Sequence, residues 1–193
     1  MTDIILASTS IYRKRQLERV HLNFRAMAPL SQEGCEIETD PTEIIQLRAR
    51  AKALSLAGIY PEAIIIGSDQ GLVFQNYLLG KPGNFDNACA QLAMLSGETA
   101  NLITSVAVVC KDKNFKKTHT DIQRLKFRKL SQEMIQRYIQ IDEPFDCAGS
   151  FKIESAGPLL FESLSGEDPT AIEGLPLMAL LRILSQLNID VLA

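Results

Sequence analysis

The feature that most constrains this chain is an apolar run that ends in polar residues, Ala-Ile-Ile-Ile-Gly-Ser-Asp-Gln at Ala63–Gln70. Three consecutive isoleucines predict a short strand buried on both faces of a sheet. The run stops at Gly67, which places Asp69 at the mouth of the predicted strand. A carboxylate there is costly to desolvate unless it meets a cation or hydrogen-bond donors, and ligands of open α/β sheets usually bind at this end of the strands. Asp69 is therefore either a functional residue or the cap of the next turn.

Length, charge and cysteine spacing exclude several classes of protein. A chain of 193 residues fits one domain, 1–193, with room for two lobes. The net charge of −3 gives no general attraction to nucleic acid or to acidic membranes. The cysteines form no CxxC pair or zinc pattern, and neither a secretory signal nor a membrane-spanning run is present. We therefore expect a cytoplasmic protein with reduced thiols, without membrane or nucleic-acid partners.

The N-terminal segment has the pattern of an anion site. Asp3–Ala7 is predicted to be a buried strand, Ser8-Thr9-Ser10 a turn, and Ile11–Val20 a helix that carries the cations Arg13, Lys14 and Arg15. The first N–H groups of a helix are unpaired and lie at the positive end of its dipole, so phosphate suits this place. The alternative is that a serine only caps the helix and the cations are solvated.

The next helix is predicted to begin at Asp40-Pro41, with Asp40 as N-cap, and to end at Gly58. Its core stripe is expected at helical spacing, at Ile44, Leu47, Ala51 and Leu54. Lys52 lies on the shoulder of that stripe, where a long side chain can bury its stem and direct its charge into a cleft. Surface exposure of Lys52 is the alternative.

The second half of the chain mixes helices and strands. Further strands are predicted at Leu22–Ala28, Leu72–Phe74, Tyr77–Leu79, Asn101–Cys110, Ile122–Phe127 and Pro158–Leu164, and further helices at Asn84–Leu95, after Ser131 and after Gly174-Leu175-Pro176. The pairs Leu72–Phe74 with Tyr77–Leu79, and Asn101–Cys110 with Ile122–Phe127, are expected to be antiparallel. Early alternation of strands and helices followed by antiparallel pairs predicts an α/β fold with a mixed sheet.

Polar groups at the ends of these apolar elements supply the parts of a polyphosphate site. They are Ser8, Arg13, Glu33, Lys52, Asp69 and Lys81, the last held in a rigid turn between Gly80 and Pro82. Cations bind phosphoryl oxygens, and carboxylates hold a divalent metal or orient a water molecule. Neither histidine stands near other candidate residues, and no Gly-x-Ser-x-Gly nucleophile motif occurs. The residues thus predict a phosphate ligand, with metal-assisted hydrolysis as one use of the site.

Five motifs, in this order, resemble the signatures of the Maf family of nucleoside triphosphate pyrophosphatases. They are Leu6–Lys14 (Leu-Ala-Ser-Thr-Ser-Ile-Tyr-Arg-Lys), Ile66–Gln70 (Ile-Gly-Ser-Asp-Gln), Gly80-Lys81-Pro82, Cys147–Lys152 (Cys-Ala-Gly-Ser-Phe-Lys) and Gly174-Leu175-Pro176. The resemblance implies cleavage between the α and β phosphates, giving a nucleoside monophosphate and pyrophosphate. It also implies an elongated mixed sheet flanked by helices, with two lobes around a deep central cleft, as in inosine-triphosphate pyrophosphatases.

By the same resemblance, Asp69 is the catalytic base and binds a divalent metal (Mg, Mn or Co) together with Glu33. Phosphates are expected at Ser8, Arg13, Lys52 and Lys81, and a homodimer is expected from the family.

Three further positions resemble the 7-methyl-GTP branch of that family, namely Tyr12, Gln70 and Glu154. An aromatic face and a carboxylate suit a methylated guanine, because that base is cationic. Glu154 can also accept hydrogen bonds from the guanine N1–H and amino group.

The chain departs from the family pattern at Ile11, where proline is usual, at Gln32 in a less acidic run, and at Ser105, where glycine is usual. A side chain at 105 is expected to crowd the cleft and slow turnover. Ser105 therefore keeps a second hypothesis open, a nucleotide-binding regulator of septum formation with little turnover. A third hypothesis is a phosphohydrolase that shares the fold but releases phosphate.

Overall fold

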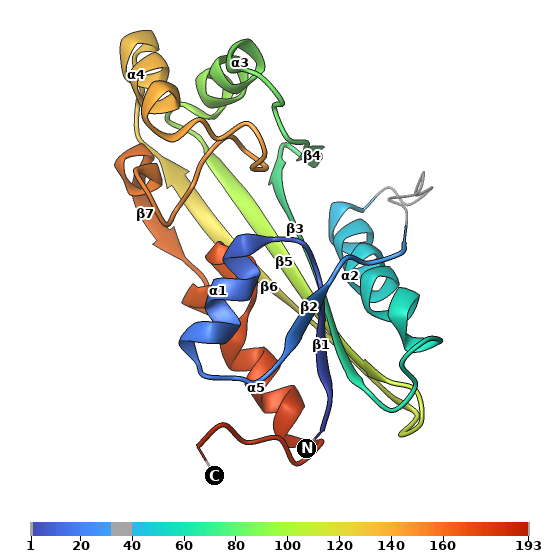
Figure 1. The fold of residues 1–193 in the computed structure, drawn as a ribbon. Helices are drawn as coiled ribbons and strands as arrows, with labels where there is room; N and C mark the ends of the chain where they lie inside the picture. The colour runs from blue at the N-terminus through green and yellow to red at the C-terminus, as the bar shows by residue number, and fades with distance from the viewer. Residues whose placement is uncertain (1, 32–39, 193) are drawn as a thin grey trace. The chain divides into compact units, whose positions relative to one another are not determined.

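The computed structural model describes residues 2–31 and 40–192, which form a mixed α/β fold. Within these residues the sheet has the order β2-β1-β3-β5-β6-β7, and β4 pairs with β3 (Figure 1). The strands are β1 Ile4–Ala7, β2 Arg25–Met27, β3 Ile64–Phe74, β4 Tyr77–Leu79, β5 Thr99–Cys110, β6 Phe115–Phe127 and β7 Phe161–Ser165. β1 pairs in parallel with β2 and β3, whereas the pairs β3–β4 and β6–β7 are antiparallel. The predicted mixed sheet is confirmed.

The helices α1 to α4 each begin after a polar residue whose side chain caps the first turn. They are α1 Ile11–Arg19, α2 Pro41–Ala57, α3 Phe85–Leu95, α4 Gln132–Asp142 and α5 Leu177–Ser185, with the 3₁₀ helices η1 Gly157–Leu160 and η2 Pro169–Glu173. The Asp40 side chain accepts a hydrogen bond from Thr42 N at 2.9 Å, and Ser131 Oγ accepts one from Met134 N at 3.2 Å. None of the helices in the described part of the chain is long and apolar enough to cross a membrane.

The chain divides into two compact units. Unit 1 comprises Met1–Asp69, Thr104–Asp121 and Asp168–Ala193, and unit 2 comprises Gln70–Ile103 and Ile122–Glu167. The strands β3, β5 and β6 contribute residues to both. The predicted cleft between two lobes stays a prediction.

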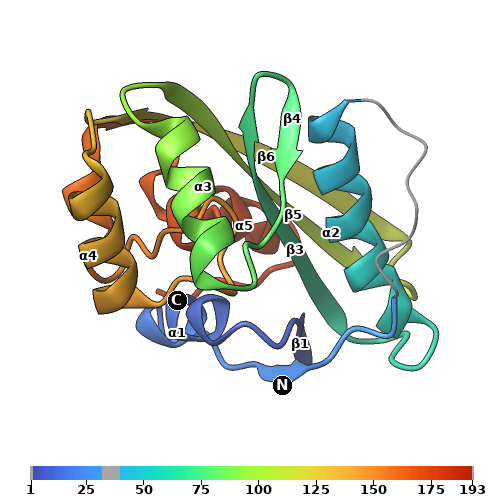
Figure 2. The same ribbon diagram turned by 90° about the horizontal axis from the view of Figure 1, so that it is seen from above.

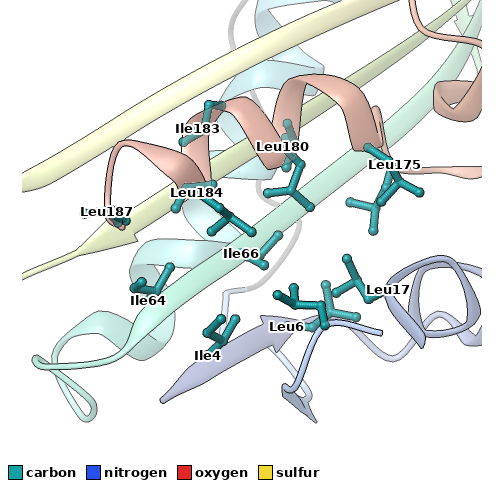
Figure 3. Close-up of a cluster of buried hydrophobic side chains, with 14 of the residues drawn as sticks. Ile4, Leu6, Leu17, Ile64, Ile66, Leu175, Leu180, Ile183, Leu184 and Leu187 are labelled. Atoms are coloured by element: carbon teal, nitrogen blue, oxygen red, sulfur yellow. The ribbon is translucent and has the colours of Figure 1, made fainter. Parts of the chain in front are cut away.

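Unit 1 buries both faces of β1 and β3, as the isoleucine run predicts. Ile64 and Ile66 pack with α1 and α5 in one cluster, around Leu17 and Leu180 (Figure 3). Ile65 lies in a second cluster with residues of α2. Figures 1 and 2 both show α2 on the opposite side of β3 from α1 and α5. Successive residues of β3 therefore face different helices.

The prediction that the apolar strand stops at Gly67 is wrong. β3 continues without interruption from Ile64 to Phe74, so Asp69 lies in the middle of a strand and not at its mouth. Gly67 marks a close approach instead of a strand end. A Cβ atom there would overlap the carbonyl oxygen of Ala49 and lie 2.6 Å from Ala53 N. Glycine inside a strand is a recognised sign of such a contact.

The predicted core stripe of α2 is also wrong. Leu47 and Leu54 are 41% and 44% exposed, whereas the fully buried face includes Ile45, Ala49 and Ala53. The prediction placed two leucines inward. The buried face instead combines Ala49 and Ala53, which lie against Gly67 of β3, with the larger Leu56. The helical spacing of the buried positions was predicted correctly, but the buried face of α2 was not.

Unit 2 has its own core. Figure 2 shows α3 beside α4, and the two helices pack against each other. Three phenylalanines fill the space next to β7, with ring centroids 4.7 Å apart for Phe127 and Phe161 and 5.1 Å apart for Phe151 and Phe161. The residues predicted for α3, Ala88, Leu92 and Leu95, are buried.

Two predicted strands are shorter than expected. The segment predicted at Leu22–Ala28 forms a strand only at Arg25–Met27, and the first part of Pro158–Leu164 belongs to η1. η1 takes Pro158 in its first turn, where the absent N–H of proline costs no helical hydrogen bond.

Candidate functional site

A buried ion pair lies at the centre of the site in unit 1. Lys52 of α2 and Asp69 of β3 form a salt bridge in which the ammonium group contacts the carboxylate directly, and Asp69 is 6% exposed. Gly67 and Asp69 lie on the same face of the strand, since side chains alternate. The missing side chain at Gly67 lets α2 approach, and Lys52, next to Ala53 of the contact face, thereby reaches Asp69.

The loop between β1 and α1 places the second cation. Ser8 is buried, and its Oγ accepts hydrogen bonds from Ser10 N at 3.1 Å and from Arg13 Nη1 at 3.4 Å. Ser10 also caps α1, because its side chain accepts from Arg13 N. The capping alternative is therefore correct for Ser10, whereas Ser8 contacts the arginine.

Arg13 is held within the electrostatic reach of Asp69. Burial lowers the pKa of the Arg13 guanidinium, although the residue as a whole is partly exposed, and the nearby Asp69 carboxylate opposes that lowering. Arg13 Nε donates to the carbonyl oxygen of Gly174 at 3.0 Å. One edge of the guanidinium is thus fixed by the backbone, which orients the rest of the fork.

The Gly174 carbonyl is shared with a residue that the sequence analysis missed. Ser68 Oγ donates to the same oxygen at 2.8 Å from within β3. Gly174 has φ +115°, and a Cβ there would lie 3.3 Å from both Cγ and Nε of Arg13. This position favours glycine for its backbone and for the space beside the arginine. The alternation of side chains along β3 could have identified Ser68, because it places Ser68 on the opposite face of the strand from Asp69.

The segment that carries Gly174 is held in place by several hydrogen bonds. Gln16 of α1 donates through Nε2 to Thr170 O at 2.8 Å and to Leu175 O at 3.1 Å. The Asp168 carboxylate accepts from Thr170 N at 3.1 Å and Met178 N at 2.8 Å, which caps both η2 and α5. The carbonyl that holds Arg13 therefore belongs to a fixed part of the fold.

Ser105 is fully buried, and its Oγ lies 2.7 Å from Thr120 Oγ1. The neighbouring Thr104 Oγ1 donates to Ala171 O at 3.0 Å. Both hydroxyl groups therefore make hydrogen bonds within unit 1. The support that Ser105 lent to a regulator without turnover is correspondingly weak.

The remaining predicted site residues are not part of the contacts described above. Tyr12 is partly buried on α1 of unit 1. In unit 2, Gln70 is partly buried in β3, whereas Lys81 and Glu154 are exposed in loops. The structure thus brings Ser8, Arg13, Lys52 and Asp69 together in unit 1, and the roles of the unit 2 residues stay predictions.

Among the residues that the structure brings together in unit 1, Asp69 carries the carboxylate for the predicted divalent metal. Among residues 2–31 and 40–192, no group of three or more His, Cys, Asp or Glu side chains is arranged to hold a metal ion. Glu33 and Gln32 lie outside the described residues. Mg²⁺ usually keeps several waters and binds one or two carboxylates together with substrate phosphates. In the structure Asp69 is paired with Lys52, and its part in binding a metal stays a prediction.

Comparison with known proteins gives relatives along the whole chain. The chain is 39% identical over 193 residues to the 7-methyl-GTP pyrophosphatase of Colwellia psychrerythraea, covering 100% of this chain and 96% of the relative. It is 41% identical over 184 residues to the protein of the same name from Hahella chejuensis, covering 95% and 92%.

A solved structure supports the fold. A HAM1 protein from Coxiella burnetii aligns with a TM-score of 0.52 at 14% identity, over 96% of this chain and 100% of the other. At that identity the likeness concerns the fold alone.

The family model described as Maf-like protein matches residues 3–187. The chain therefore belongs to the Maf-like protein family.

Proposed function

We propose that this chain is a nucleoside triphosphate pyrophosphatase that hydrolyses 7-methyl-GTP to 7-methyl-GMP and pyrophosphate. The observation that carries the proposal is the buried Lys52–Asp69 pair with Arg13 within electrostatic reach, all inside unit 1. The names of the relatives and the membership of the Maf-like family support the same activity.

In the proposed reaction, Asp69 orients a water molecule toward the α-phosphorus and takes its proton. The water oxygen forms the new bond to phosphorus, the bond from the α-phosphorus to the bridging oxygen breaks, and pyrophosphate leaves with the electron pair. Lys52 and Arg13 stabilise the charge on the phosphoryl oxygens. Because one edge of Arg13 is bound to Gly174 O, its Nη groups are already oriented when the substrate arrives.

Several parts of the proposal concern groups beyond this cluster. A divalent metal held by Asp69, with Glu33, would neutralise phosphate charge. Lys81 is assigned to the phosphates, Tyr12 to stacking on the cationic base, and Gln70 and Glu154 to its hydrogen-bonding edge. A homodimer in the cytoplasm, without nucleic-acid partners, completes the proposal.

The test is a product assay on a panel of 7-methyl-GTP, GTP, dTTP and UTP with Mg²⁺, Mn²⁺ or Co²⁺. We expect stoichiometric pyrophosphate and monophosphate, with 7-methyl-GTP preferred. Release of orthophosphate would contradict the reaction and favour another phosphohydrolase. Tight nucleotide binding without product would contradict the enzyme and favour the regulator.

A further inference from the structure

We infer that Asp142, at the end of α4, is a positioning residue for Glu154 and thereby sets the selectivity for the base. The inference rests on the proposed function, since it concerns the residue assigned there to the guanine edge. All the contacts that support it lie within unit 2.

Asp142 holds the residues that follow Glu154. Its side chain is buried, and Oδ1 accepts a hydrogen bond from Ser155 Oγ at 2.7 Å. Oδ2 accepts from Ala156 N at 3.1 Å. A carboxylate that accepts from both a side chain and a backbone amide fixes the local backbone, because either donor would be left unpaired if the turn moved.

The same helix end holds the residues that precede Glu154. Lys152 N donates to Tyr138 Oη at 3.0 Å, and Lys152 Nζ donates to Asp142 O at 2.8 Å. Tyr138 is itself buried, so the acceptor of this hydrogen bond has a fixed place in unit 2. Both flanks of Glu154 are therefore anchored to one turn of α4.

The backbone closes the turn from inside. Ser155 N and Gly157 N both donate to Lys152 O, at 3.2 and 2.9 Å. A Cβ at Gly157 would overlap that oxygen and lie 2.7 Å from the carbonyl carbon of Lys152, so a larger residue cannot close the turn in this way. The turn that carries Glu154 has little freedom to move while Asp142 is in place.

Glu154 itself is exposed and makes no hydrogen bond or ion pair within the described part of the chain. Its neighbours are fixed, and its carboxylate accepts no hydrogen bond from the described residues. This is the arrangement of a recognition group on a rigid support, which loses little conformational entropy on binding.

The experiment compares kcat/KM for 7-methyl-GTP and for UTP in three variants. Asp142→Asn keeps the shape of the side chain but leaves one acceptor oxygen, whereas Asp142 uses both of its oxygens. Ser155→Ala removes only one hydrogen bond at an exposed residue, so it tests the idea even if Asp142→Asn folds poorly. Glu143→Gln, the exposed neighbour of Asp142, is the matched control.

We expect the preference for 7-methyl-GTP over UTP to fall about tenfold in Asp142→Asn and about threefold in Ser155→Ala, and to stay unchanged in Glu143→Gln. A purely structural role would lower both substrates equally. Equal losses, or an unchanged preference, would overturn the inference.

A second measurement separates this inference from the proposed function. Amide hydrogen exchange at residues 153–156 needs no substrate, and Asp142→Asn should speed it at least tenfold over the wild type. Unchanged exchange would overturn the positioning role even if the enzyme is active. If the wild type releases no pyrophosphate from any nucleotide, the proposed function fails, and faster exchange would still establish the anchored turn.

Discussion

The candidate residues of the two units are held in opposite ways. In unit 1, Asp69 is buried and engaged by Lys52, and Arg13 is bound to Gly174 O. In unit 2, Glu154 is exposed and makes no hydrogen bond or ion pair with the described residues, while the backbone on both sides of it is anchored to α4. This difference agrees with the proposed roles. A group proposed to act in bond breaking gains from a preorganised, low-dielectric surrounding, whereas a group proposed to select a base must stay open to it. Four changes test this comparison.

The largest effect is expected for Asp69→Asn. The amide cannot take a proton from water, and Lys52 loses its charged partner, so kcat for pyrophosphate release should fall about a thousandfold. Steady-state assays and thermal melts would be run beside Asp112→Asn, an exposed aspartate of the β5–β6 turn. Equal rates in wild type and Asp69→Asn would contradict the proposed catalytic role of Asp69.

The next effect concerns Gly67→Ala. The new methyl group would overlap the backbone of α2 at Ala49 and Ala53, so α2 must shift away from β3. We expect a loss of about 3 kcal/mol in the free energy of unfolding and a melting temperature lower by roughly 10 °C. Gly58→Ala is the matched control, since nothing lies within 4 Å of a Cβ there. Similar stability of the two variants would argue against the close contact that brings Lys52 to Asp69.

A smaller effect, on selectivity alone, is expected for Glu154→Gln. The substitution keeps the size but removes the charge that suits a cationic base, so the preference for 7-methyl-GTP over UTP should fall about tenfold. The rate on saturating UTP and the melting temperature should change little, because the residue is exposed. A loss common to all nucleotides would place Glu154 in the chemistry and erase the distinction between the units.

The smallest effect is a pH dependence of unit 2. Burial, and then the charge of Asp146, raise the pKa of the Cys147 thiol from 9.0 to about 12. A raised pKa means that the folded state holds the proton more tightly, so this contribution to stability is complete below pH 9 and is lost as the pH rises toward 12. The melting temperature of the wild type relative to Cys147→Ala should therefore be constant up to pH 9 and fall between pH 9 and 11. A difference that stays constant over this range would contradict the prediction.

Local patterns predicted most elements of the fold. The hairpin at Gln75-Asn76 follows from residues that tolerate positive φ, here +48° and +66°. The caps Asp40 and Ser131 marked helix starts because a short polar side chain can satisfy free N–H groups of the first turn. Each of these features depends on residues within a few positions of one another.

Predictions failed where a neighbour from far along the chain decided the outcome. Gly67 was interpreted as a strand end because its partner, the alanine face of α2, cannot be identified from the strand alone. The phase of α2 was misjudged for the same reason. Ser68 and Gly174 were overlooked as a pair, since 106 residues separate them.

The sequence by itself determined that a buried strand carries Asp69, that a serine-rich turn precedes a cationic helix, and that the whole chain resembles the Maf family. Only the tertiary structure decided which of these residues meet. Lys52 reaches Asp69 because glycine and alanine allow a helix to lie against a strand, and Arg13 is oriented by a carbonyl 161 residues away. The physical reason is that hydrogen bonding and propensity act locally, whereas close packing depends on which surfaces finally come together.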